Sequence, residues 1–395
     1  MFSNRFLKVV EIHYLLSRIS WATPLKFNSS TRQITLPRFA RLRCYFMVIV
    51  LLALSFYLIL QVFRIYRLKN YNSDNFYFLY GLTIVCLISN CFQLIFSLLP
   101  KELAFIIREI LEFLVEIKEQ FRPLFDPNKD RMTFLFDYTL IFIQLMCLNG
   151  GIVTTFHFIA FPNAPMYPIN DLPYDWGKLF WVRVVQFFVW GLINLAGWSY
   201  VATTLISAGT YAMYIIPLVV NEMSFAKRGS KKKPMYKTRG SLRQPEVLKC
   251  YYRRVEILHL YLLKLFGLIL VPIQTLIYQL VLFCNFMLLT KFDSLSKPTT
   301  IMLIIWSGFG TFGWTLTLHI GGQMHVRSSQ TLSSWGRHDW GTPRDNKMMS
   351  KFRKSCLPLK LGYERTFIIR RLTVLKFLRG VIKGTFRTLL TTKNK

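Results

Sequence analysis

Six long stretches of the chain are almost free of charged residues, and they limit what the chain can fold into. They cover residues 44–63, 76–99, 134–160, 184–220, 265–290 and 299–325, and Asp137 is the single charged residue in them. A helix needs about 20 predominantly apolar residues to cross the hydrocarbon core of a bilayer. We therefore predict an all-α integral membrane protein with six clear transmembrane helices. Because stretch 184–220 exceeds that length, we expect one long helix there that is tilted or projects beyond the bilayer.

The composition supports this class and argues against nucleic-acid binding. A formal net charge of +31 would indicate a nucleic-acid partner in a soluble protein. However, 53% of the residues are hydrophobic and only 17% are charged, and the charges are concentrated between the six stretches. We therefore expect the lipid bilayer as a partner and no nucleic acid.

Lysine and arginine residues are distributed very unevenly between the two sides of the predicted bundle. Segments 1–43, 100–133, 221–264 and 326–395 hold 43 of the 50 basic residues. Segments this rich in basic residues stay in the cytosol. We therefore predict a cytosolic amino-terminal tail at 1–43, a transmembrane bundle at 44–325 and a cytosolic loop at 326–365.

The segment 366–392 combines apolar residues with a regular series of basic ones. Lys376, Arg379, Lys383 and Arg387 are three or four residues apart, which places them on one face of a helix. The segment is either an amphipathic helix on the inner membrane surface or a seventh membrane helix whose basic face is sheltered. A charge at the bilayer centre costs roughly 2.5–3.5 kcal/mol, so the residues alone favour the surface helix.

Aromatic residues in the predicted outer halves of the spans are candidates for ligand binding. Tyr80, Phe156, His157, Trp190 and Trp306 are expected to lie deeper than the aromatic residues that mark a membrane boundary. A mostly apolar pocket with a few polar groups suits a small lipophilic molecule. We predict a ligand site from these five residues; the alternative is that they only pack between helices.

The sequence shows no arrangement that is typical of an enzyme. No serine, histidine and aspartate set has a recognisable local context, and His157, His319 and His325 have no paired carboxylate. We therefore predict no catalytic residue, no metal site and no cofactor.

The layout of the chain resembles the gustatory and odorant receptors of arthropods, a superfamily of seven-transmembrane chemosensory receptors. The shared features are a cytosolic amino terminus, spans of this spacing, a long fourth helix and a short tail. The segments YERTFIIRR (363–371) and VLKFL (374–378) are similar in layout to the last helix of that family and its lead-in. Thr385-Phe386 and Leu389-Leu390 stand where the family has a Thr-Tyr … Gln-Phe signature. The chain therefore resembles divergent members, such as the receptor-like proteins of springtails.

The resemblance implies a plasma-membrane chemosensory receptor that responds to a small molecule. It further implies a ligand-gated cation channel, a homo- or hetero-oligomer that is a tetramer, and a last helix that lines the pore. The four basic residues conflict with a cation pore, because a positive lining repels cations. The alternative function is a non-channel membrane transporter or scaffold of unknown substrate.

Overall fold

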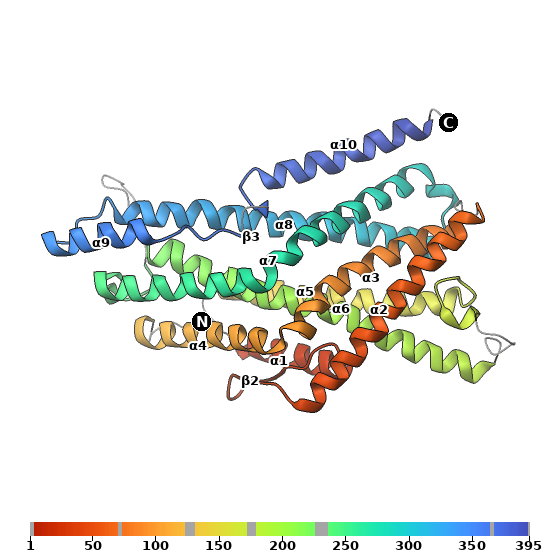
Figure 1. Cartoon of the computed structure of the whole chain (residues 1–395), viewed down its shortest axis with the longest axis horizontal. Coiled ribbons are helices and arrows are strands. Elements are labelled where there is room, and N and C mark those ends of the chain that lie inside the picture. Colours follow the sequence, from red (N-terminus) through yellow and green to blue (C-terminus); the bar gives the residue numbers. More distant parts are fainter. Residues whose placement is uncertain are drawn as a thin grey trace.

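The computed structural model describes residues 4–69, 73–122, 131–171, 179–225, 236–363 and 367–393, which form a bundle of long helices (Figure 1). Within these described residues, six helices are long and apolar enough to cross a membrane. They are α2 (Arg38–Arg67), α3 (Asp74–Leu98), α5 (Arg131–Ala160), α6 (Phe180–Pro217), α7 (Pro245–Thr290) and α8 (Lys297–Trp335). The prediction of an all-α, multi-pass membrane protein with six apolar spans is confirmed. The long fourth stretch is α6, which continues as the π-helical turn η4 (Leu218–Glu222).

The two ends of the bundle differ in structure (Figure 1). At one end, called the turn end below, lie the end of α2, the start of α3, the α7–α8 turn with η6 (Phe292–Ser294), and the loop 161–171 with η2 (Pro168–Asp171). At the other, called the α9 end, lie α4 (Pro100–Phe121), α9 (Pro343–Ser355) and the first half of α7. The 46 residues of α7 measure about 70 Å at 1.5 Å per residue, so this helix is much longer than a bilayer core.

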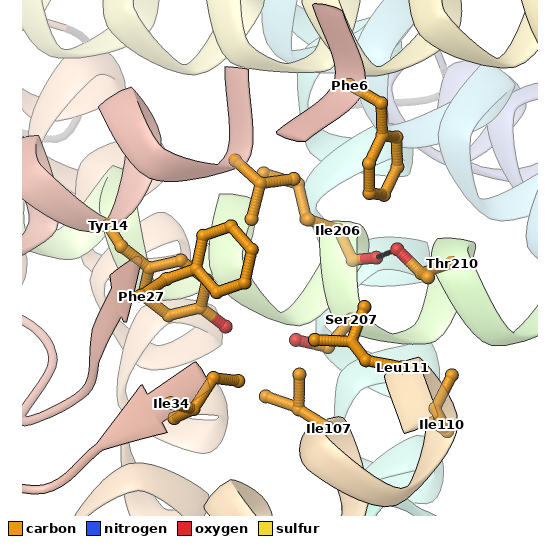
Figure 2. A pocket seen from close by; sticks show the side chains of 11 residues that line it. Phe6, Tyr14, Phe27, Ile34, Ile107, Ile110, Leu111, Ile206, Ser207 and Thr210 are labelled. Atoms are coloured by element: carbon orange, nitrogen blue, oxygen red, sulfur yellow. Dashed lines mark hydrogen bonds between the residues drawn. The ribbon is translucent and has the colours of Figure 1, made fainter. Parts of the chain in front are cut away.

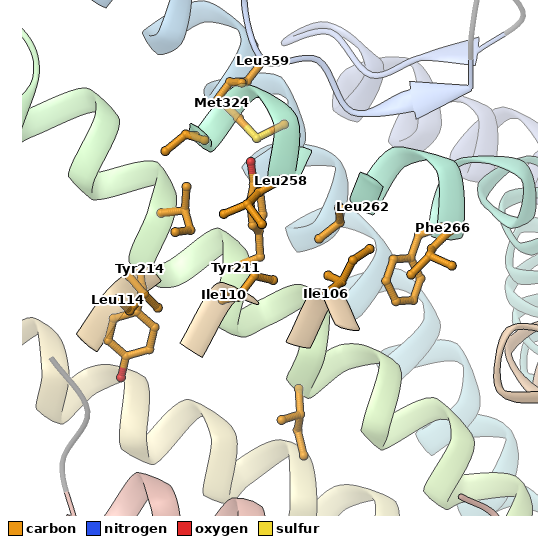
Figure 3. Close-up of a cluster of buried hydrophobic side chains, with 14 of the residues drawn as sticks. Ile106, Ile110, Leu114, Tyr211, Tyr214, Leu258, Leu262, Phe266, Met324 and Leu359 are labelled. Atoms are coloured by element: carbon orange, nitrogen blue, oxygen red, sulfur yellow. The ribbon is translucent and has the colours of Figure 1, made fainter. Parts of the chain in front are cut away.

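The helices at the α9 end are held together by an apolar core. Ile106, Ile110 and Leu114 recur every four residues along α4 and are at most 3% exposed. Figure 3 shows them facing side chains of α6 and α7, among them Tyr211 and Leu258. This amphipathic pattern explains why α4 is a helix although its charged residues prevent it from crossing a membrane.

The segment 1–43, predicted as a cytosolic amino-terminal tail, contains regular structure from Asn4 onward. Helix α1 (Asn4–Ile19) packs on α5 and α6, and an antiparallel hairpin of β1 (Lys26–Asn28) and β2 (Gln33–Thr35) lies against α1 and α4. Phe6, Val10 and Tyr14 are four residues apart and point into the core. Hydropathy misses α1 because the helix is too short and too charged to span a bilayer.

The segments expected as loops at the α9 end also contain regular structure. Segment 221–264 includes η5 (Gly240–Arg243) and the first part of α7, and segment 326–365 includes the end of α8, α9 and strand β3 (Gly362–Tyr363). A buried carboxylate fixes this region. Glu222 accepts hydrogen bonds from Arg122 Nη2 at 2.8 Å and from the Thr238 amide at 3.0 Å. Because a buried charge is costly unless it is paired, this site ties α4 and the residues before α7 to the end of α6.

The carboxyl-terminal segment differs from the single helix expected at 366–392. Strand β4 (Phe367–Ile368) pairs with β3, and helix α10 (Thr373–Lys393) begins only after this hairpin. The part of the lead-in at 364–366 lies outside the described residues. Gly362 has a φ of +151°, and a Cβ there would lie 2.0 Å from the Phe367 carbonyl oxygen, so the hairpin requires glycine. Helix α10 packs on α7 and α8 and ends near the turn end (Figure 1).

Candidate functional site

Five aromatic side chains from four helices and a loop meet inside the half of the bundle nearest the turn end. They are Phe78 of α3, His157 of α5, Tyr167 of loop 161–171, Trp190 of α6 and Trp306 of α8, and each is at most 4% exposed. The His157 ring stacks on Phe78 at 3.6 Å between centroids, and the Trp306 ring lies 5.5 Å from Phe78. The Tyr167 ring lies edge-on to Trp190 at 5.1 Å. We call these five residues the aromatic cluster.

The polar atoms of the aromatic cluster are few, and one lacks a partner. His157 Nδ1 lies 2.9 Å from the Tyr167 hydroxyl, and Trp190 Nε1 donates a hydrogen bond to the Thr154 carbonyl at 3.2 Å. Trp306 Nε1 is buried and has no hydrogen-bond partner among the described residues. Leaving a buried donor unpaired costs about 1–3 kcal/mol, so an acceptor on a bound molecule would be stabilised there.

Close approach of α3 to α8 fixes the position of the Trp306 ring. Gly81 of α3 faces this ring, and a Cβ at Gly81 would lie 2.5 Å from Trp306 Cζ3. A larger residue at this position would therefore push the indole out of the cluster. The glycine is one reason why a tryptophan can be fully buried between these two helices.

The structure brings together three of the five predicted ligand-site residues. His157, Trp190 and Trp306 belong to the aromatic cluster, and Tyr80 lies beside it, accepting a hydrogen bond from Gln279 Nε2 at 2.7 Å. Phe156 does not join them, because its side chain is 57% exposed on the surface of α5. Neighbouring helical residues point about 100° apart, so Phe156 cannot share the direction of His157.

Sequence reasoning missed Phe78 and Tyr167. Phe78 lies in a helix in which most residues are apolar, so its sequence does not distinguish the face toward the cluster. Tyr167 comes from an irregular loop with several prolines, and no periodic pattern predicts the direction of its side chain. Only the folded arrangement shows that a loop residue fills the site.

The loop 161–171 closes the aromatic cluster at the turn end. Its Met166 and Tyr167 side chains are fully buried. The Asp171 carboxylate accepts hydrogen bonds from the Tyr57 hydroxyl at 2.8 Å, from Gln61 Nε2 and from Arg64 Nη1 at 3.0 Å. These three donors all come from α2, so Asp171 attaches the loop to the bundle.

Helix α10 carries the second candidate site. Its basic residues Lys376, Arg379, Lys383 and Arg387 are all exposed, whereas Phe377 and Val381 on the opposite side are about 5% exposed and pack on the bundle. The structure therefore confirms that the four basic residues share one helix face. It places this helix beside the apolar spans α7 and α8.

A small cavity lies elsewhere, between α1, the β1–β2 hairpin, α4 and α6 (Figure 2). Its volume is about 30 Å³, and its polar atoms come from Tyr14, Ser207 and Thr210. Pockets for small organic ligands usually measure several hundred Å³, whereas this one has room for about two water molecules. It is a packing gap beneath the amino-terminal helix and not a ligand site of useful size.

A buried histidine joins the amino-terminal helix to two spans. His13 Nδ1 lies 2.5 Å from Gln144 Oε1, and Nε2 lies 2.7 Å from Thr203 Oγ1. Burial lowers the pKa of His13 from its ordinary value of 6.5 to about 4, so the ring is neutral at pH 7. Within the described residues, no group of three or more His, Cys, Asp or Glu side chains has the geometry of a metal site.

Comparison with known proteins identifies the fold. No protein-family model matches the chain, and no curated protein matches its sequence. The fold is similar to that of a solved insect olfactory receptor. The structure of the insect olfactory receptor OR5 from Machilis hrabei matches with a TM-score of 0.66 over 97% of both chains, at 8% sequence identity.

A second structure of the same receptor, in complex with eugenol, matches with a TM-score of 0.66, covering 97% of this chain and 98% of the receptor. At 8% identity this likeness shows the fold and not the function. It confirms the resemblance to the insect chemosensory receptors that the layout of the sequence indicated.

Proposed function

We propose that the chain is a chemosensory receptor of the odorant or gustatory type, which binds a small lipophilic molecule and opens an ion channel in response. The observation that carries the proposal is the buried aromatic cluster, set in a fold shared over 97% of the chain with an insect olfactory receptor. Small-molecule sites are mostly apolar, with few polar groups that fix orientation. Tyr80, His157, Trp190 and Trp306 supply this chemistry here, with Tyr167 from the loop. Phe156 is left out of the proposed site, because it points away from the bundle.

The proposed setting is the plasma membrane, with the amino terminus in the cytosol and the turn end outside. The distribution of basic residues supports this orientation, because segments 1–43, 100–133, 221–264 and 326–365 hold 35 of the 50. The proposed active form is a homo- or hetero-oligomer, a tetramer by resemblance. Supporting this, α10 leaves large apolar side chains exposed, among them Leu375, Ile382 and Phe386 at about 60%.

The test uses the purified full chain in planar lipid bilayers, with eugenol and related apolar aromatic molecules as probes. We expect a current that rises with probe concentration and saturates. Trp306→Phe keeps an aromatic ring but removes the pyrrole part of the indole with its unpaired N–H, so probes with an acceptor should need about tenfold higher concentration for the half-maximal current. Trp181→Phe is the matched control, because Trp181 is 75% exposed on α6.

Two results would contradict the proposal. The first is no current with any probe, although the protein is folded. The second is probe-dependent solute uptake without current, which would favour the transporter alternative.

A further inference from the structure

The basic residues of α10 lie at the depth of the membrane centre. The uncharged stretch 265–290 of α7 has its midpoint beside Tyr278. The Tyr278 hydroxyl donates a hydrogen bond to the Gly380 carbonyl oxygen at 2.9 Å, and a Cβ at Gly384 would lie 2.8 Å from Leu282 Cδ2. Arg379 and Lys383 immediately precede these two glycines. They are therefore level with the middle of the apolar part of α7, and not with either membrane surface.

These two side chains also point away from the bundle. Val381 is 6% exposed and packs inward, and residues 379 and 383 each lie about 160° from residue 381 around a helix axis. Both basic side chains are exposed, and α10 contains no aspartate or glutamate. Facing the hydrocarbon, each would cost roughly 2.5–3.5 kcal/mol.

The position of Arg379 and Lys383 restricts how that cost can be avoided. Lys376 and Arg387 lie nearer the ends of α10 and can extend toward a membrane surface. Arg379 and Lys383 are too central for this. Charged residues inside a membrane face either a partner of opposite charge or a water-filled space.

We infer that the α10 helices of several copies of this chain surround a water-filled path whose positive lining conducts anions, such as chloride, and excludes cations. The inference rests on the proposed oligomeric channel and assigns its ion selectivity. Rings of Arg and Lys side chains are typical of anion pores. The resemblance implies a cation channel. The inferred anion selectivity differs from it because this chain has four basic side chains on one face of α10.

The first experiment needs no ligand. Lys383→Cys and Arg379→Cys variants of the full chain, in lipid nanodiscs, are treated with negatively and positively charged methanethiosulfonate reagents. Modification is located by mass spectrometry, and each rate is divided by the rate on a free thiol. The remaining basic residues should make the negative reagent react about tenfold faster than the positive one at positions 379 and 383.

Control positions show whether the reagents reach residues 379 and 383 through a water-filled path or simply react with every cysteine. Val381→Cys lies on the buried side of the same helix and should react with neither reagent, whereas the exposed native Cys250 should react with both. Absence of reaction at both 379 and 383 would place α10 against lipid and overturn the inference. Faster reaction with the positive reagent would overturn it as well.

The second experiment measures ion selectivity in the presence of an activating probe. In a potassium chloride gradient, the reversal potential should move toward the chloride equilibrium potential. The double variant Arg379→Glu, Lys383→Glu should move it toward the potassium equilibrium potential. A wild-type reversal potential that moves toward the potassium equilibrium potential would contradict an anion path and leave the receptor proposal standing. A missing response to the probe would contradict only the receptor proposal.

Discussion

At the residue scale, single polar side chains attach peripheral segments to the spans. Asp171 accepts three hydrogen bonds from α2 and thereby holds the loop that places Tyr167 in the aromatic cluster. His13 joins α1 to α5 and α6 through Gln144 and Thr203. Hydropathy predicts neither site, because the partners are more than a hundred residues apart in the chain.

Removing the charge of Asp171 should loosen the loop 161–171. In Asp171→Asn the charge-assisted bonds to Arg64 and Tyr57 are weakened, so the loop should open more often. Cys284 is fully buried and belongs to the same apolar core as Tyr167. When the loop opens, a small thiol reagent reaches Cys284 more easily, so Cys284 should be modified about fivefold faster in Asp171→Asn than in wild type.

Two comparisons decide whether Asp171 has this specific effect. Asp293→Asn makes the same chemical change in the α7–α8 turn and should leave the modification of Cys284 unchanged. Cys44, which is buried in the other apolar core, should also keep its rate in every variant. Equal rates at Cys284 in wild type and Asp171→Asn would show that Asp171 does not hold the loop.

Acid should weaken the attachment of α1. Burial lowers the pKa of His13 to about 4, so the folded state favours the neutral ring. The contribution of neutral His13 to the stability of the folded state is complete above pH 6.5 and is lost as the pH falls toward 4. The total loss in the free energy of unfolding is limited to about 3 kcal/mol. Thermal unfolding of the protein in nanodiscs should therefore show a transition temperature that decreases through this range. In His13→Gln the decrease should be smaller; an identical profile would refute the role of His13.

At the element scale, the sequence predicts the six spans well because long apolar stretches have one simple explanation in a bilayer. For α10 it leaves a surface helix and a seventh membrane helix open, and hydropathy does not indicate the contact of α10 with α7 at Gly380 and Gly384. The sequence does not indicate α1, α9 or the first part of α7, because these helices are stabilised by packing on the rest of the bundle, which a count of apolar residues does not measure.

The packing of α10 on α7 predicts a specific cross-link. The double variant Leu282→Cys, Gly384→Cys should form a disulfide under mild oxidation, because these positions are in contact. Leu282→Cys with Ile382→Cys should not, since the Ile382 side chain is 59% exposed and points elsewhere. Peptide mapping of the oxidised protein distinguishes the pairs. The opposite pairing would mean that α10 is rotated or lies elsewhere.

At the scale of the whole molecule, the two termini should lie on opposite sides of the membrane. If α10 crosses beside α7, a tag fused after Lys395 should bind antibody on intact cells, and a tag fused before Met1 should bind only after permeabilisation. The uneven distribution of basic residues gives the side of the amino terminus. Both tags on the cytosolic side would leave six spans and remove the basis for a pore lined by α10.

A structure of the full chain in a lipid bilayer tests the proposed receptor channel most directly. It should show a symmetric oligomer in which the α10 helix of each copy borders one central path, with Arg379 and Lys383 facing water. A monomer, or an oligomer whose α10 helices face lipid, would contradict both the channel and its proposed anion selectivity.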